Sequence, residues 1–122
     1  MRNGPLRSLT RKRDFEAVFR EGVNTAFRYV VIYARPNGLK MTRLGLSVSK
    51  KVGKAVVRNR LKRLLRVAMR KGSEGLRLGY DFIVIARKSS VEAKLDDFIR
   101  DIRKFLSRLR NEKNSDIVCD TL

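Results

Sequence analysis

The chain has 122 residues, 43% of them hydrophobic, and its 30 Lys and Arg against 12 Asp and Glu give a formal net charge of +18. This apolar content is enough for one compact core and too high for a disordered basic tail. So large a charge favours a polyanionic partner: nucleic acid, an acidic protein or, least of all, an anionic membrane. No apolar run of about 18 residues and no secretory signal is present, so we expect a cytoplasmic protein without membrane contact.

The residue types that most protein-borne catalysis requires are missing. The sequence has no His and a single cysteine, Cys119, which excludes an imidazole base, a zinc site of the usual ligands and an internal disulfide. It also lacks a glycine-rich phosphate-binding loop that ends in Gly-Lys-Ser or Gly-Lys-Thr. We therefore predict no catalytic residue, no metal site and no cofactor bound by the protein itself.

The first predicted element is a short helix. Residues 1–10 show little pattern, and we expect them to be flexible. The helix spans residues 11–21. It places Phe15, Val18 and Phe19 on one face, at the spacing of an amphipathic helix.

Two strands are predicted next. Residues 27–35 are rich in aromatic and β-branched types, and residues 42–50 alternate apolar with small or polar types. Alternation puts four side chains on one face of the first strand: Phe27, Tyr29, Val31 and Tyr33. In the second strand Gly45 leaves the outer face shallow, open to a closely approaching backbone. A short additional strand would fit at 23–25 or at 39–41.

The second half of the chain alternates helix, strand and helix. Residues 54–71 carry an apolar stripe on an otherwise basic helix, and residues 92–110 keep the helical period throughout. Between them, residues 80–87 form a continuous apolar run, which indicates a strand buried on both faces. Residues 111–122 form a polar tail that we expect to be flexible. The pattern predicts one α+β domain over residues 1–110, with helices packed on a small mixed sheet in the order α-β-β-β-α-β-α if the additional strand forms.

Negative charge is absent from a long central interval. No Asp or Glu occurs between Glu21 and Glu74, whereas a solvated surface normally mixes both signs. The interval contains fourteen cations: Arg28, Arg35, Lys40, Arg43, Lys50, Lys51, Lys54, Arg58, Arg60, Lys62, Arg63, Arg66, Arg70 and Lys71. This pattern indicates a surface that binds a polyanion. Acids return towards the C-terminus, so the last helix is expected to be scaffold.

The basic helix is the strongest local signal. Residues 51–71 carry nine cations and no acid, and several like charges lie one helical turn apart, each pair costing a few tenths of a kcal/mol. A helix face that is merely soluble would mix Glu with Lys, whereas a surface that contacts phosphates explains the pattern. Asn59, between two arginines, suits a base edge, a sugar hydroxyl or a metal-bound water, and the sequence does not choose among them.

Aromatic side chains form a second candidate element. Phe15 and Phe19 of the first helix, with Tyr29 and Tyr33 of the strand, either pack in the core or line a groove, and the sequence leaves both open. In a groove, each aromatic face would stack an unpaired base with about 1–3 kcal/mol. Such a surface favours RNA over duplex DNA. The basic helix has neither a helix-turn-helix partner nor a dimer-forming heptad, so DNA is not expected.

The residue order around the basic helix resembles a known family. Residues 45–66 (GLSVSKKVGKAVVRNRLKRLLR) resemble the signature of the bacterial ribonuclease P protein subunit, with the tripeptide Arg-Asn-Arg at its centre. Residues 14–22 (DFEAVFREG) and 80–88 (YDFIVIARK) resemble flanking parts of the same family. The similarity covers roughly residues 6–110, in the expected order.

The resemblance implies a fold and a function. The fold would be a two-layer sandwich of a mixed four-stranded sheet and three helices, with a left-handed strand–helix–strand crossover. The function would be to assist a ribonucleoprotein endonuclease that removes the 5′ leader from precursor tRNA. Its RNA subunit would hold the catalytic magnesium ions, so the partners of the protein would be this catalytic RNA and precursor tRNA.

The resemblance also implies the roles of particular residues. Those that contact the catalytic RNA would be Lys51, Lys54, Arg58, Asn59, Arg60, Lys62, Arg63 and Arg66. Those that form a cleft for the leader would be Phe15, Phe19, Tyr33, Ser49, Lys50 and Arg87. Composition alone leaves three rival functions: a structural ribosomal protein, a nuclease that acts without RNA, and a transcription regulator.

Overall fold

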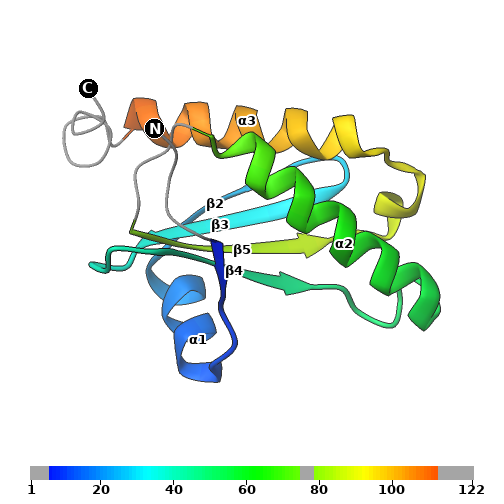
Figure 1. Cartoon of the computed structure of the whole chain (residues 1–122), viewed down its shortest axis with the longest axis horizontal. Coiled ribbons are helices and arrows are strands. Elements are labelled where there is room, and N and C mark those ends of the chain that lie inside the picture. The colour runs from blue at the N-terminus through cyan, green and yellow to red at the C-terminus, as the bar shows by residue number, and fades with distance from the viewer. Residues whose placement is uncertain (1–5, 75–78, 113–122) are drawn as a thin grey trace.

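The chain folds into one five-stranded sheet with helices on both faces (Figure 1). The structure, a computed structural model, describes residues 6–74 and 79–112. The elements, in chain order, are β1 (Leu6–Ser8), α1 (Lys12–Glu21), β2 (Val23–Ala26), β3 (Val30–Pro36), β4 (Thr42–Ser47), α2 (Ala55–Gly72), β5 (Tyr80–Ala86), the 3-10 helix η1 (Lys88–Glu92) and α3 (Leu95–Glu112). The three predicted helices and three predicted strands are all present.

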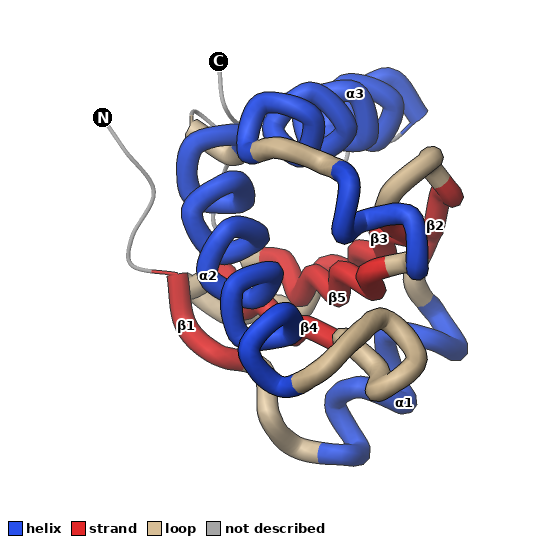
Figure 2. Tube along the Cα trace, turned by 90° about the vertical axis from the view of Figure 1, so that its right-hand side faces the viewer, coloured by secondary structure: helices blue, strands red, loops and turns tan. Residues whose placement is uncertain are grey.

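The sheet has the strand order β1-β4-β5-β3-β2. Its central strand, β5, runs parallel to β4 and antiparallel to β3. Six of its seven residues are buried, and the seventh, Ile85, is partly buried. The continuous apolar run in the sequence therefore did indicate a strand covered on both faces. Figure 2 shows the cause: α2 and α3 lie on one side of the sheet and α1 lies on the other.

Two details of the predicted sandwich are wrong, although its α+β class is confirmed. The sheet has five strands rather than four, because Leu6–Ser8, within the segment expected to be flexible, pairs in parallel with β4. A three-residue strand is too short to show a period of two. Helix α1 adds a third layer to the predicted two, because it packs on the sheet face opposite α2 and α3. The additional strand forms at Val23–Ala26 and not at residues 39–41.

The crossover from β4 through α2 to β5 is left-handed, as Figures 1 and 2 together show. Parallel neighbouring strands are almost always connected in the right-handed sense. Neither composition nor periodicity carries information on this handedness, and only the resemblance implied it. One consequence is that α2 lies over β4, towards the β1 edge of the sheet, while α3 lies over β3.

The main core lies between the sheet and the two long helices. It is centred on fully buried side chains: Ile32, Leu61, Leu65, Met69, Phe82, Phe98 and Ile102. Burial of each such side chain contributes roughly 1.5–3 kcal/mol. A smaller core of Leu9, Val18 and Ile83 holds α1 on the other face. The face of α2 that is turned away from the main core is thus left to solvent.

The boundaries of several predicted elements differ from expectation: the strand predicted over residues 42–50 ends at Ser47, and the helix predicted from residue 92 begins at Leu95. The strand predicted from residue 27 begins at Val30, and Phe27 and Tyr29 pack against the main core instead of continuing the alternation. Helix α3 extends to Glu112, so the first two residues of the predicted tail are helical. The rest of that tail, Cys119 included, lies outside the described residues.

Candidate nucleic-acid interface

The exposed face of α2 is a stripe of cations. Asn59, Arg63, Arg66 and Arg70 follow at helical spacing and are all exposed, with Arg60 beside them. The opposite face, from Leu61 to Met69, is buried in the main core. Within the part of the chain that the structure describes, no acid lies within ion-pair distance of any α2 cation. The helix thus presents several uncompensated positive charges to solvent.

The turn before α2 continues this positive surface. Lys51 lies in the turn, where its backbone N–H donates to Ser49 Oγ at 3.2 Å, and Lys54 is the N-cap residue of α2. No side chain caps the helix and its first turn contains no acid, so the positive end of the helix dipole is not neutralised locally. The eight residues predicted to contact RNA therefore lie on one continuous segment.

Arg58 differs from its neighbours in the Arg-Asn-Arg tripeptide. Its Nη1 donates to the carbonyl oxygen of Gly53 at 2.9 Å, and its side chain is partly buried. One of its five N–H donors is thus used to fix the turn before the helix, and the others remain for a ligand. Asn59 and Arg60 point outward without such a bond among the described contacts.

The positive surface also reaches β1, which the sequence did not predict. Arg66 and Arg70 line a small hollow of about 80 Å³ at the edge of the sheet. The other lining residues are Leu6, Arg7, Ser8 and Leu44. The charges of Arg7 and Arg70 were visible in the sequence, but their proximity required the pairing of β1 with β4.

Among the described residues, acids neutralise two of the fourteen cations in the acid-free interval. Arg35 bonds to Glu21, Nε to Oε1, at 2.8 Å, and Arg43 bonds to Asp81 through two of its nitrogens. The hydrogen bonds to Asp81 hold the pKa of Arg43 above its ordinary value. Both arginines lie on the α1 side of the sheet. The interval is therefore a mixture of exposed cations and cations that hold the fold.

Three predicted aromatic residues lie together on the α1 side of the sheet. The rings of Phe15 and Phe19 are 6.3 Å apart between centroids, and Phe19 meets Tyr33 edge to face at 4.9 Å. Phe15 packs on Gly45, where a Cβ would lie only 2.5 Å from its Cζ. The shallow face of β4 is thus filled by an aromatic ring rather than by a backbone. Phe19 is 43% exposed, so this cluster is half core and half surface.

An uncovered strip of sheet lies beside the aromatic cluster. The strand register aligns Gly45, Ile83 and Tyr33 in one row, which α1 covers. The next row on the same face remains at least partly exposed and consists of Ala26, Val31, Ser47 and Ile85. The floor of this strip is made of small or aliphatic side chains, bordered on one side by aromatic rings.

The other three predicted cleft residues lie at the far border of this strip. Ser49 and Lys50 follow β4, and Arg87 follows β5; because these strands are neighbours and parallel, all three leave the sheet at the same edge. Ser49, Lys50 and Arg87 are all exposed. Arg87 donates from Nη1 to the carbonyl oxygen of Phe27 at 2.8 Å, which fixes its side chain beside the sheet. The six predicted residues thus surround one face, in two groups.

Tyr29 does not belong to this face. Its ring packs edge to face against Phe98 of α3, with centroids 6.4 Å apart, on the opposite side of the sheet from Tyr33. The irregular backbone at residues 27–29 breaks the alternation that would have grouped the two tyrosines. For Tyr29 the choice between groove and core is therefore settled in favour of the core, against which Phe27 also packs.

The described ranges hold neither a metal-binding cluster nor a membrane span. Residues 6–74 and 79–112 contain no group of three or more His, Cys, Asp or Glu side chains placed to hold a metal ion. No helix in these ranges is long and apolar enough to cross a membrane.

The sequence and the fold both match known proteins. Residues 5–110 match the family Ribonuclease P. The chain is 43% identical over 103 residues to the ribonuclease P protein component of Caldanaerobacter subterraneus subsp. tengcongensis, covering 84% of this chain and 89% of the relative. It is 41% identical to that of Clostridioides difficile, covering 84% and 90%.

Solved structures give the same result. The fold is similar to that of the RNase P protein of Staphylococcus aureus, with a TM-score of 0.75, 30% identity, and coverage of 87% of this chain and 97% of that one. The RNase P protein of Thermotoga maritima gives a TM-score of 0.72, 34% identity, and coverage of 83% and 96%. The chain therefore belongs to the family of bacterial ribonuclease P protein components, the protein subunits of the endoribonuclease that processes the 5′ ends of tRNA.

Proposed function

We propose that this chain is a noncatalytic subunit that binds the catalytic RNA through α2 and the 5′ leader of precursor tRNA through the strip beside α1. The observation that carries the proposal is the row of α2 cations with no acidic partner among the described residues. The proposed RNA contacts are Lys51, Lys54, Arg58, Asn59, Arg60, Lys62, Arg63 and Arg66. Chemistry would then take place on the RNA, with the protein as its support.

Helix α2 would act on the folding and charge of the RNA. Arginine forks bind phosphate oxygens in pairs, and each neutralised phosphate releases condensed counterions. Phosphates that are brought close around the RNA's magnesium ions repel one another. Cations from α2 would reduce this repulsion and so lower the magnesium concentration that the RNA needs.

The strip beside α1 would select precursor over product. Phe19 has a partly exposed ring that meets Tyr33 edge to face, and unpaired bases stack on such rings with little preference for sequence. Ser49, Lys50 and Arg87 would contact the sugar–phosphate backbone from the opposite border. Because mature tRNA has no leader, this added affinity would strengthen substrate binding without slowing product release.

Cleavage of precursor tRNA by a matching catalytic RNA, with and without the protein, tests the proposal. At low magnesium we expect the protein to raise cleavage strongly, and at high magnesium we expect the advantage to shrink. An equal rate with and without protein at low magnesium would contradict the proposal. Cleavage by the protein without RNA would instead support the rival nuclease, while co-sedimentation with ribosomal subunits or preference for duplex DNA would support the other two rivals.

A further inference from the structure

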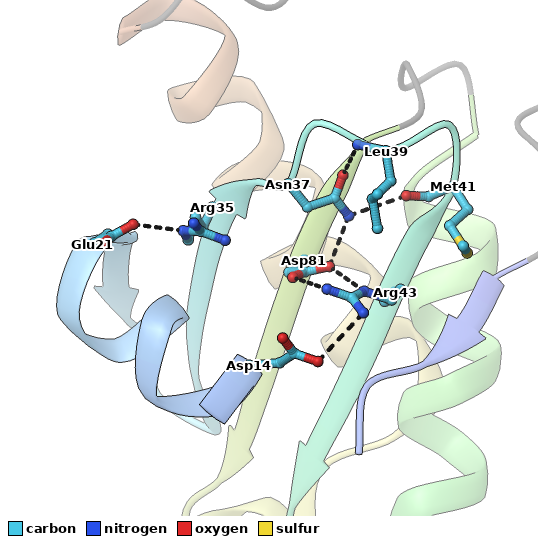
Figure 3. A network of polar contacts seen from close by, with 8 residues as sticks. All are labelled: Asp14, Glu21, Arg35, Asn37, Leu39, Met41, Arg43 and Asp81. Atoms are coloured by element: carbon cyan, nitrogen blue, oxygen red, sulfur yellow. Dashed lines mark hydrogen bonds and ion pairs between the residues drawn. The ribbon is translucent and has the colours of Figure 1, made fainter. Parts of the chain in front are cut away.

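A partly buried polar network connects four elements on the α1 side of the sheet (Figure 3). Asp81 on β5 is fully buried and accepts two bonds from Arg43 on β4, Nε to Oδ1 at 2.8 Å and Nη2 to Oδ2 at 2.7 Å. Asn37, in the turn between β3 and β4, donates to Asp81 Oδ1 at 2.8 Å. The remaining arm of the guanidinium, Nη1, lies 3.4 Å from Oδ2 of Asp14 on α1.

The Arg43–Asp81 pair and the Asp14–Arg43 contact contribute differently to the stability of the fold. The pair of Arg43 with Asp81 is short and doubly bonded, and its carboxylate is fully buried, so it stabilises the fold. The contact of Asp14 is longer, and both side chains are about a quarter exposed, at 24% for Asp14 and 22% for Arg43. A pair of that kind contributes little to the free energy of unfolding. Its geometry is nevertheless specific, because Arg43 is held in place by Asp81.

The contact of Asp14 lies directly beside the aromatic cluster. Phe15 is the next residue of α1 and rests on Gly45, which follows Arg43 by two positions on the same face of β4. One turn further along α1, Phe19 meets Tyr33. The contacts of Asp14 with Arg43 and of Phe15 with Gly45 therefore both join the first turn of α1 to β4. A shift of that turn would move both phenylalanine rings relative to the sheet.

We propose that Asp14 is a positioning residue. Through its contact with Arg43, which Asp81 holds in place, it fixes α1 where Phe15 and Phe19 border the strip proposed to bind the leader. This inference rests on the proposed function of that strip. Asp14 itself would not touch the leader; its negative charge would even repel it. If Asp14 positions the rings, it strengthens the binding of precursor tRNA. If only its charge matters, it weakens that binding.

The substitution Asp14→Asn tests this, with Glu16→Gln as the matched control. Both remove one negative charge from α1, and Glu16 is exposed with no ion pair among the described residues. Each variant is assembled with the catalytic RNA, and its affinity for precursor tRNA and for mature tRNA is measured. Because misplacement of a binding group costs affinity, we expect Asp14→Asn to weaken precursor binding about threefold to tenfold and to leave mature tRNA binding unchanged. Glu16→Gln should leave both unchanged or slightly tighter.

Further measurements separate positioning from folding. The melting temperature of Asp14→Asn should remain close to that of the unsubstituted protein, and KM for precursor should rise with kcat unchanged. Combined with Phe19→Ala, Asp14→Asn should have less effect than alone, because the ring that it positions is gone. Tighter precursor binding by Asp14→Asn, equal weakening for mature tRNA, or full additivity with Phe19→Ala would overturn the inference. If the unsubstituted holoenzyme itself shows no preference for precursor, the proposed cleft fails instead.

Discussion

Arginines on the two sides of the sheet have opposite environments. On α2, Arg60, Arg63 and Arg66 are exposed and have no acidic partner among the described residues, whereas on the α1 side Arg35 and Arg43 are each bound by a carboxylate. All five come from the same acid-free interval of sequence. The acids that bind the second group lie outside that interval and reach it only through the fold. An arginine's role here depends on which carboxylate the fold brings to it, and not on the charge of its sequence neighbours.

The largest effect is expected on the free energy of unfolding, from the arginines that are bound by carboxylates. Asp81→Asn removes the carboxylate that Arg43 binds with two nitrogens and leaves that guanidinium only the more distant Asp14. Removal of one partner of a buried pair leaves a poorly compensated charge, and because Arg43 is partly exposed we expect a loss of about 2–3 kcal/mol. Urea denaturation measures it. The control Asp96→Asn removes an exposed acid of α3 that has no ion pair among the described residues, and an equal loss there would contradict the distinction.

Substitution of the unpaired arginines of α2 should weaken RNA binding without lowering stability. The double variant Arg60→Gln with Arg63→Gln should weaken binding to the catalytic RNA by about tenfold to a hundredfold, which corresponds to a loss of roughly 1.4–2.8 kcal/mol for the two exposed contacts together. The slope of log affinity against log salt should become shallower by about 0.7–0.9 for each phosphate that the variant no longer neutralises. The free energy of unfolding should not decrease, because two repelling charges are removed.

Arg103→Gln is the control for that variant. Arg103 is an exposed cation of α3 with no ion pair among the described residues, so it matches the chemistry of the α2 arginines but lies on a different surface. We expect RNA affinity and salt slope to be nearly unchanged. If Arg103→Gln weakens binding as much as one α2 substitution does, RNA binding is spread over the whole cationic surface and is not specific to α2.

The sequence predicted the elements well and their contacts less well. Strand β5 and helix α3 were found because burial on two faces and on one face leave different patterns of apolar residues. Strand β1 was missed because three residues cannot show a period, and the grouping of Tyr29 with Tyr33 failed because an irregular backbone at residues 27–29 interrupts the alternation. These errors are local, and neither displaces the predicted core.

In the candidate site, too, local patterns predicted which residues share an element but not their long-range contacts. Helical spacing places Asn59, Arg63 and Arg66 on one exposed face of α2, because a helix's own period decides which side chains share a face; their contact with RNA stays a prediction. The neutralisation of Arg43 by Asp81 was not predicted, since the two residues are far apart in the sequence and only the parallel pairing of β4 with β5 places them side by side. Long-range register, like the left-handed crossover, is not encoded in a local pattern.

The smallest expected effect comes from a buried acid that lacks the partners of Asp81. Asp101 on α3 is buried, its Oδ2 has no hydrogen-bond partner among the described residues, and Arg100 reaches its Oδ1 only at 3.9 Å. Burial raises its pKa above the ordinary carboxyl value, with Arg100 and Lys104 acting against this and Asp97 with it. The folded state therefore holds this proton more tightly than the unfolded state does. Stability contributed by the protonated carboxyl is present at low pH and is lost as pH rises through the raised pKa.

The variant Asp101→Asn should remove this pH-dependent cost. At neutral pH we expect it to be more stable than the unsubstituted protein by about 1 kcal/mol, because the amide carries no charge to desolvate. As pH falls towards the range where ordinary carboxyls protonate, the difference between the two proteins should shrink to near zero. Urea denaturation at several pH values measures that difference directly. A variant that is less stable at neutral pH would mean that the charge of Asp101 is compensated after all. In that case the contrast between partnered and unpartnered charges would hold for the arginines of this fold but not for its buried acids.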